Sequence, residues 1–147
     1  MKNRIYGLDP GGYDPKQVET MADWELFLNY YSVSYAAWHE GHDASRDYAH
    51  GHISDEMFES TKRHIQELRY SINYLIYTIC KRNKIPVNEP QFGKTIIPDA
   101  ELFMKWYRFY DAHFMHKLTD KEWAEFKRRR KLGKDVSAFL PTGDWRA

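Results

Sequence analysis

The sequence predicts an all-α protein that consists of a long antiparallel helical hairpin, a second and shorter helical pair, and irregular N- and C-terminal arms. Two long segments carry apolar residues at alternating spacings of three and four, which is the spacing of a heptad seam and not of a strand. One short stretch, residues 50–53, separates these segments, as in a helical hairpin. The proline-containing residues 85–98 then separate the hairpin from a further apolar segment with helical spacing.

Residues 1–13 are expected to form an irregular arm, because Asp9-Pro10-Gly11-Gly12 is a strong turn signal. The first long helix is predicted to begin after Asp14, a good N-cap followed by Pro15, or alternatively at Thr20. It should run to roughly Asp47. Its apolar stripe consists of Trp24, Phe27, Tyr31, Ser34, Trp38, Gly41, Ser45 and Tyr48.

Small residues on this stripe predict that the second helix approaches the first most closely near Gly41. A glycine inside a helix costs about 1 kcal/mol relative to alanine, so a close contact would have to offset it. The alternative is that the first helix breaks at Glu40-Gly41.

The second long helix has the clearest boundaries in the chain. Ser54 is a good N-cap, cations gather at the opposite end, and Ile85-Pro86 terminates the helix. Its predicted seam consists of Ile65, Leu68, Ile72, Leu75 and Ile79. The hairpin as a whole covers residues 14–84, and a helix of roughly 30 residues spans about 45 Å, which is longer than a domain of this size needs. A partner that covers the excess length is one explanation.

Residues 85–98 are predicted to be a linker, residues 99–133 a second helical pair, and residues 134–147 an aperiodic tail. The third helix opens at Asp99 and is apolar over two adjacent stripes. The fourth opens with a capping box formed by Thr119 and Glu122 and ends before Gly133. A chain of 147 residues is expected to form one domain, residues 1–147.

Composition and charge limit where the protein is expected to be located and which partners it is expected to bind. The single cysteine, Cys80, excludes an internal disulfide, and no apolar run approaches the roughly 20 residues of a membrane span. We therefore expect no membrane partner and a location in the cytoplasm or within an intracellular or viral assembly. Residues 1–60 hold four Lys or Arg against eleven Asp or Glu, whereas residues 61–147 hold eighteen against ten, which suggests two different partner surfaces or internal complementarity.

The leading functional hypothesis is a non-enzymatic structural or protein-interaction subunit of a larger assembly, such as a viral particle or a multisubunit complex. Aromatic residues make up 16% of the chain, and they are as typical of interfaces as of cores. A protein partner or a homo-oligomer follows from this hypothesis. The predicted partner-binding residues are Trp106, Tyr107, Tyr110, Phe114, Phe139 and Trp145. An aromatic core is the competing interpretation.

The first alternative is a small nucleic-acid-associated protein that uses the basic end of its fourth helix. The candidate residues are Lys127, Arg128, Arg129, Arg130 and Lys131. Acidic residues precede this run, so the same pattern also arises from a helix whose charges complement its dipole.

The second alternative is a helical metal-binding protein that uses two His-x-x-His pairs, His39 with His42 and His113 with His116. Imidazoles three residues apart share a helical face, but neither a Glu-x-x-His nor a His-Glu-x-x-His pattern occurs. Nucleophile-elbow, phosphate-loop and dinucleotide-binding motifs are absent as well, so an enzyme is less expected than an interaction protein, and no cofactor is expected.

Overall fold

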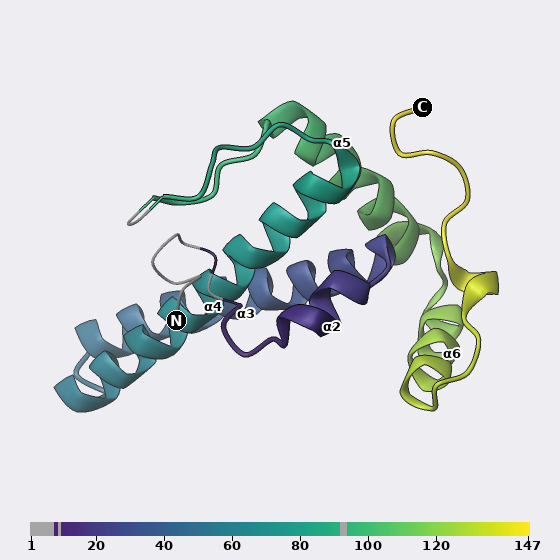
Figure 1. The fold of residues 1–147 in the computed structure, drawn as a ribbon. Helices are drawn as coiled ribbons and strands as arrows, with labels where there is room; N and C mark the ends of the chain where they lie inside the picture. The colour runs from purple at the N-terminus through teal and green to yellow at the C-terminus, as the bar shows by residue number, and fades with distance from the viewer. Residues whose placement is uncertain (1–7, 9, 92–93) are drawn as a thin grey trace. The chain divides into compact units, whose positions relative to one another are not determined.

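The computed structural model describes residues 8, 10–91 and 94–147, and over these residues the protein is all-α, as the sequence predicts. The two long helices are α3 (Asp23–Ala49) and α4 (Asp55–Asn83), which pack against each other as a hairpin (Figure 1). A short helix, α2 (Pro15–Thr20), precedes them. The shorter helical pair consists of α5 (Ala100–Asp111), which continues into a π-helical turn (Ala112–Lys117), and α6 (Asp120–Lys131).

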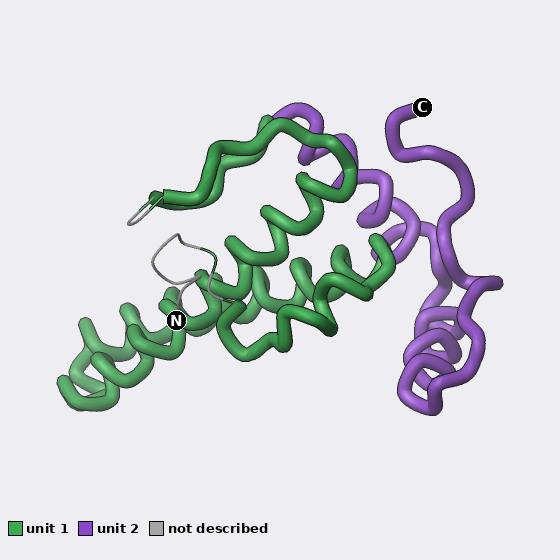
Figure 2. Tube along the Cα trace, in the orientation of Figure 1, with its two compact units in different colours: residues 1–99 green, residues 100–147 purple. Residues whose placement is uncertain are grey.

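The chain divides into two compact units, residues 1–99 and residues 100–147 (Figure 2). The boundary falls where the sequence predicts the second helical pair to begin. The single cooperative domain over residues 1–147 stays a prediction.

The start of the first helix differs from the sequence-based prediction of one continuous helix. Asp14 does cap α2, since its carboxylate accepts a hydrogen bond from the Lys16 backbone N–H at 3.0 Å. The helix then stops at Thr20, and Met21 takes an extended conformation before α3 begins. The interruption turns both Val18 and Met21 into the core, where both are buried.

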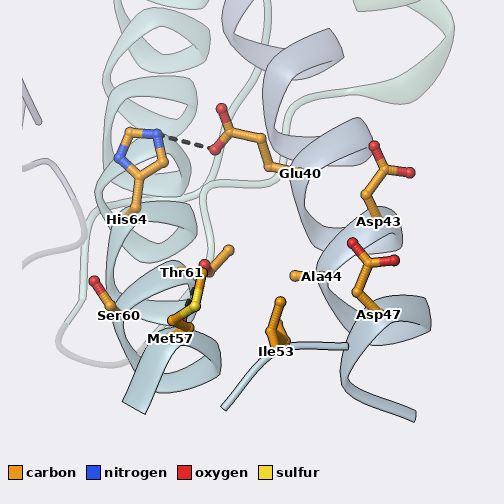
Figure 3. Close-up of a pocket in the computed structure, with 9 residues that line it drawn as sticks. All are labelled: Glu40, Asp43, Ala44, Asp47, Ile53, Met57, Ser60, Thr61 and His64. Carbon is orange, nitrogen blue, oxygen red and sulfur yellow. Dashed lines mark hydrogen bonds and ion pairs between the residues drawn. The ribbon is translucent and has the colours of Figure 1, made fainter. Parts of the chain in front are cut away.

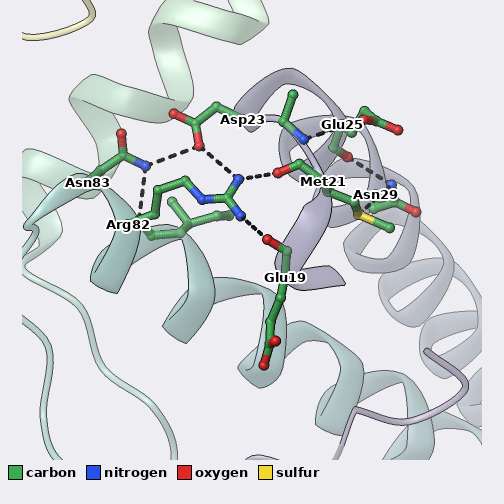
Figure 4. A network of polar contacts seen from close by, with 9 residues as sticks. Glu19, Met21, Asp23, Glu25, Asn29, Arg82 and Asn83 are labelled. Atoms are coloured by element: carbon green, nitrogen blue, oxygen red, sulfur yellow. Dashed lines mark hydrogen bonds and ion pairs between the residues drawn. The ribbon is translucent and has the colours of Figure 1, made fainter. Parts of the chain in front are cut away.

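Arg82 of α4 stabilises this interruption (Figure 4). Its guanidinium donates to the backbone carbonyls of Met21 and Glu19, the latter at 2.9 Å, and forms an ion pair with Asp23 at 3.6 Å. One cation thus satisfies the carbonyl groups that the end of α2 leaves without helical partners. The local sequence of residues 14–23 does not predict this contact, because Arg82 lies about 60 residues further along the chain.

The core of the hairpin lies where the beginning of α3 packs beside the end of α4. We call this part the proximal hairpin. Leu26, Phe27 and Leu28 of α3 are buried there together with Leu75, Ile79 and Cys80 of α4. The predicted seam therefore has the correct register, but the burial of its residues decreases from the proximal to the distal part of α4. Ile65, Leu75 and Ile79 are buried, whereas Leu68 and Ile72 are half-buried.

Gly41 lies inside an uninterrupted α3, so the alternative of a helix break at Glu40-Gly41 is wrong. A methyl group added at Gly41 would meet the Ile65 Cδ1 atom at 3.6 Å, an ordinary contact distance.

Gly11, in the N-terminal arm, is a position where a close approach of the backbone does require glycine. It has φ +66°, and a Cβ there would lie 1.9 Å from the Ser71 Oγ atom. Ser71 also donates to the Pro10 carbonyl at 3.1 Å, which anchors the arm on α4.

The second unit is held together by aromatic rings. Phe114 of the π-helical turn packs against Phe126 of α6 with ring centroids 5.4 Å apart, and Phe126 in turn lies 6.2 Å from the ring of Phe139. The predicted capping box is present: the Thr119 hydroxyl accepts from the Glu122 backbone N–H at 3.1 Å, and the Glu122 carboxylate accepts from the Thr119 N–H at 3.0 Å. These bonds fix the start of α6.

Candidate interaction surface on the helical hairpin

The outer part of the hairpin buries very little of its own surface. In residues 35–69, which we call the distal hairpin and all of which the structure describes, only Ala44 and Ile65 are buried. Two helices that lie side by side share one seam, and a third layer is needed to cover their remaining apolar side chains. In the proximal part α2 contributes to that layer. The distal hairpin therefore leaves large apolar side chains in contact with solvent.

Exposed and half-buried side chains form a row of rings along α3, which we call the aromatic row: Tyr31, Tyr35, Trp38, His39 and His42. The row continues outward from the buried ring of Phe27, whose centroid lies 6.0 Å from that of Tyr31.

Each ring in the aromatic row touches the next. The ring centroids of Tyr31 and Tyr35 lie 6.5 Å apart in a stacked arrangement, and those of Tyr35 and His39 lie 4.2 Å apart. Trp38 lies parallel to His42, with centroids 5.4 Å apart and an interplanar angle of 4°. The side chains of Tyr35 and Trp38 are 59% and 64% exposed. These contacts, together with that of Trp38 on His39 at 4.8 Å between centroids, make the row one contiguous aromatic surface.

A groove of about 580 Å³ runs beside the aromatic row, between α3 and α4. Trp38 and His42 form one wall, and Phe58, Lys62 and Arg69 line the other, so we call it the basic groove. The Lys62 ammonium pairs with Glu59 at 2.9 Å and lies 5.2 Å above the Phe58 ring. Arg69 has no hydrogen bond or ion pair to any residue in the described part of the chain. The groove thus combines an exposed indole with an available guanidinium.

A second groove, of about 480 Å³, lies on the other flank of the α3–α4 contact (Figure 3). Three carboxylates, Glu40, Asp43 and Asp47, line its α3 side, and we call it the acidic groove. Glu40 contacts the His64 imidazole at 2.9 Å. Asp43 and Asp47 share one cation, Arg46, at 3.5 and 3.6 Å, so carboxylates outnumber cations there.

The α4 side of the acidic groove carries an exposed apolar side chain, that of Met57. It is 58% exposed. The tip of the hairpin beyond it is braced, because the Tyr48 hydroxyl donates to the Asp55 carboxylate at 2.6 Å and the Tyr48 ring stacks on Phe58 with centroids 4.1 Å apart. The bond to Asp55 raises the pKa of Tyr48, since a phenolate would repel that carboxylate.

The partner-binding residues predicted from the sequence lie elsewhere, in the second unit. Trp106, Phe114 and Trp145 are buried, and Tyr107, Tyr110 and Phe139 are half-buried. Their role in binding a partner stays a prediction. Since the two rings most exposed in the described chain belong to Trp38 and Tyr35, the hairpin offers more accessible aromatic surface than α5 does.

The basic run of α6 is partly neutralised within its own helix. Glu125 accepts two hydrogen bonds from Arg128, at 2.6 and 3.0 Å, and a third from Arg129 at 3.0 Å. These cations lower the pKa of Glu125 to about 2. Lys127 lies 5.6 Å above the Trp123 ring. Arg130 and Lys131 are exposed at the end of the helix. This arrangement fits the helix-dipole interpretation of the run, and nucleic-acid binding stays an untested alternative.

The two histidine pairs fall in different units. His39 and His42 contact the rings of Tyr35 and Trp38. The His113 Nε2 atom lies 2.5 Å from the Phe139 carbonyl oxygen, and His116 pairs with Asp111 at 3.2 Å. Among the described residues, no three His, Cys, Asp or Glu side chains meet in an arrangement that would hold a metal ion. The metal-binding hypothesis therefore gains no support from the geometry.

Cys80 packs in the hairpin core, as its place beside the predicted seam suggests. Burial raises the pKa of its thiol to about 12, because a thiolate would lose its hydration there. The adjacent Lys81 and Arg82 do not activate it. The raised pKa keeps this thiol protonated at neutral pH, so it does not favour a nucleophilic role.

The distal hairpin is a surface that the sequence pattern did not predict, although its residues carry a signal for it. After Tyr31 the predicted α3 stripe mixes small residues, Ser34, Gly41 and Ser45, with the large rings of Trp38 and Tyr48. The structure leaves both of these rings exposed. Small seam residues bury little side chain, so the neighbouring rings are left at the surface.

The chain matches no protein-family model, and neither the curated proteins nor the solved structures contain a significant match to it. In the described part of the chain, no helix has both the length and the apolar character required to cross a membrane.

Proposed function

We propose that this protein is a non-enzymatic interaction subunit that joins a larger assembly through its distal hairpin. The observation that carries the proposal is the aromatic row on α3, whose rings contact one another, whose Tyr35 and Trp38 are exposed, and which is continuous with the core at Phe27. Exposed, contiguous apolar surface of this kind is typical of protein-binding sites, and aromatic side chains supply most of the binding energy in such sites.

The charge pattern supports a protein partner more than a nucleic acid at this surface. Cations and carboxylates line opposite flanks of the hairpin, so a nucleic acid would meet Glu40, Asp43 and Asp47 on one side. Protein partners tolerate both signs of charge, because rim charges of either sign orient the complex. Nucleic-acid binding by the α6 run remains the second candidate function, at a different place in the chain.

Affinity capture with the full-length tagged chain, followed by quantitative mass spectrometry, tests the proposal. The test variant is Tyr35→Ser with Trp38→Ser, and the matched control is Ile97→Ser, which removes a side chain that is equally exposed, 64%, but lies outside the hairpin. Wild type and the control should retain the same proteins, and the double variant should lose them. Equal retention by all three would contradict the proposal. Circular dichroism of each variant establishes that the helices are intact.

A further inference from the structure

The two grooves of the distal hairpin complement each other in charge. The basic groove presents the exposed indole of Trp38 beside Lys62 and Arg69. The acidic groove presents the exposed thioether of Met57 opposite Asp43 and Asp47. Because they lie on opposite flanks of the α3–α4 contact, one molecule cannot bring its own grooves together. A second copy can.

We propose that the chain associates head to tail with further copies of itself, with the basic groove of one protomer against the acidic groove of the next. This inference rests on the proposed function, since it identifies the occupant of the distal hairpin. The occupant is assigned by charge complementarity: the same chain carries both the surplus of carboxylates and the available guanidinium of Arg69.

The apolar part of the contact would place Met57 of one protomer against Trp38 of its neighbour. Methionine is flexible and polarisable, and its sulfur makes favourable contacts with aromatic rings. Both side chains are more than half exposed, so their contact removes apolar surface from water on both protomers. Within the described residues of the first unit, no further layer covers either side chain.

The polar part would pair Arg69 with the carboxylates of the acidic groove. Asp43 and Asp47 share Arg46, so one more cation there improves the balance of charge. An association through two copies of the basic groove would instead bring Lys62 and Arg69 toward their own counterparts. Like charges across an interface oppose association, which disfavours the isologous dimer.

When two protomers associate in this way, the basic groove of one and the acidic groove of the other remain unoccupied. Such heterologous contacts continue until they close into a ring or extend as an open chain. The protein would therefore act as a repeating structural element, and its mean mass would rise beyond that of a dimer as its concentration increases.

Two complementary variants test the proposal by sedimentation velocity. The basic-groove variant carries Trp38→Ala with Arg69→Glu, and the acidic-groove variant carries Met57→Ala with Asp43→Lys. Each should sediment as a monomer of 17.7 kDa by itself, because each lacks one half of the contact. An equimolar mixture should form a dimer and nothing larger, because each variant supplies the groove that the other lacks. Trp38→Ala alone should weaken association about thirtyfold, as expected for an aromatic anchor.

The outcomes separate this proposal from the proposed function. A wild-type protein that stays at 17.7 kDa at every concentration overturns self-association, and so does an equimolar mixture that stays monomeric although the wild type associates. An acidic-groove variant that dimerises alone shows an isologous contact and also overturns the head-to-tail proposal. If the wild type is monomeric while Trp38-dependent capture of another protein persists, the surface stands and its occupant is a different chain. If that capture fails as well, both proposals fall.

Discussion

At the scale of single residues, Gly11 and Gly41 both lie close to α4, but only Gly11 occupies a position where a larger residue does not fit. Gly11 combines a positive φ with a position where a Cβ would overlap the Ser71 side chain, so no other residue fits without movement of the arm. Gly41 sits in regular helix, and an added methyl group finds ordinary contact distance. The glycine that the sequence pattern singled out is therefore the more replaceable one.

We predict that Gly11→Ala lowers the free energy of unfolding by about 1 to 3 kcal/mol, because alanine is strained at this φ and its methyl group displaces Ser71. Gly41→Ala serves as the control and should raise the same quantity by up to about 1 kcal/mol, because alanine is the better helix former. Gly41→Leu should be less favourable than Gly41→Ala, since the branch extends toward Ile65. Urea denaturation measures all three, and equal effects of the two alanine variants would contradict the assignment.

The carboxylate of Glu125 supplies a prediction about pH. Its pKa falls from an ordinary 4.5 to about 2 because Arg128 and Arg129 stabilise the charged form. A depressed pKa means that the contribution of this group to stability is present above pH 4.5 and disappears as the pH falls toward 2. The site is exposed, so salt should weaken the effect. Carboxyl NMR titration should place its midpoint well below that of an ordinary glutamate, and a midpoint near 4.5 would show that the ion pairs do not persist in solution.

At the scale of the elements, the sequence predicts the helices better than it predicts their contacts. The bounds of α4 follow from local signals, a Ser54 cap at one end and cations at the other, and the structure confirms them. The break between α2 and α3 depends on Arg82, which is distant in sequence, so local patterns could not reveal it.

The candidate site could be predicted only in part, for a similar reason. Aromatic content is compatible with interfaces and with cores, and it does not say which rings stay outside. Exposure of Trp38 and Tyr35 depends on the end of the α2 layer and on the small seam residues opposite, whereas Trp106 is buried although its local pattern is equally apolar. Burial is a property of the packed layers, which periodicity alone does not specify.

We predict that stability along α4 follows the observed gradient of burial. Leu75→Ala and Ile79→Ala remove fully buried side chains and should each cost about 2 to 5 kcal/mol. Leu68→Ala removes a half-buried side chain and should cost distinctly less. Equal losses at Leu68 and Leu75, measured by urea denaturation, would mean that the distal hairpin is as tightly packed as the proximal one.

At the scale of the whole molecule, packing and accessible surface are separated along the first unit. The proximal hairpin, with α2 and the arm at Gly11, holds most of its buried residues, and the distal hairpin holds the exposed rings and both grooves. Buried residues and exposed rings therefore occupy different ends of the same two helices. Because few buried contacts hold the distal part, we expect its backbone amides to exchange with solvent faster than those of the proximal part until a partner covers them.

We propose that the distal hairpin is covered when the protein assembles, and the oxidation rate of Met57 at increasing protein concentration tests this directly. Met57 lies in the acidic groove and is 58% exposed, while Met104, 38% exposed on α5, provides an internal control in the same molecule. The rates at which dilute peroxide converts each side chain to the sulfoxide can be followed by mass spectrometry over a range of protein concentrations. We predict that the rate at Met57 falls severalfold as concentration rises while the rate at Met104 stays constant. A rate at Met57 that is the same at every concentration would contradict self-association through the acidic groove.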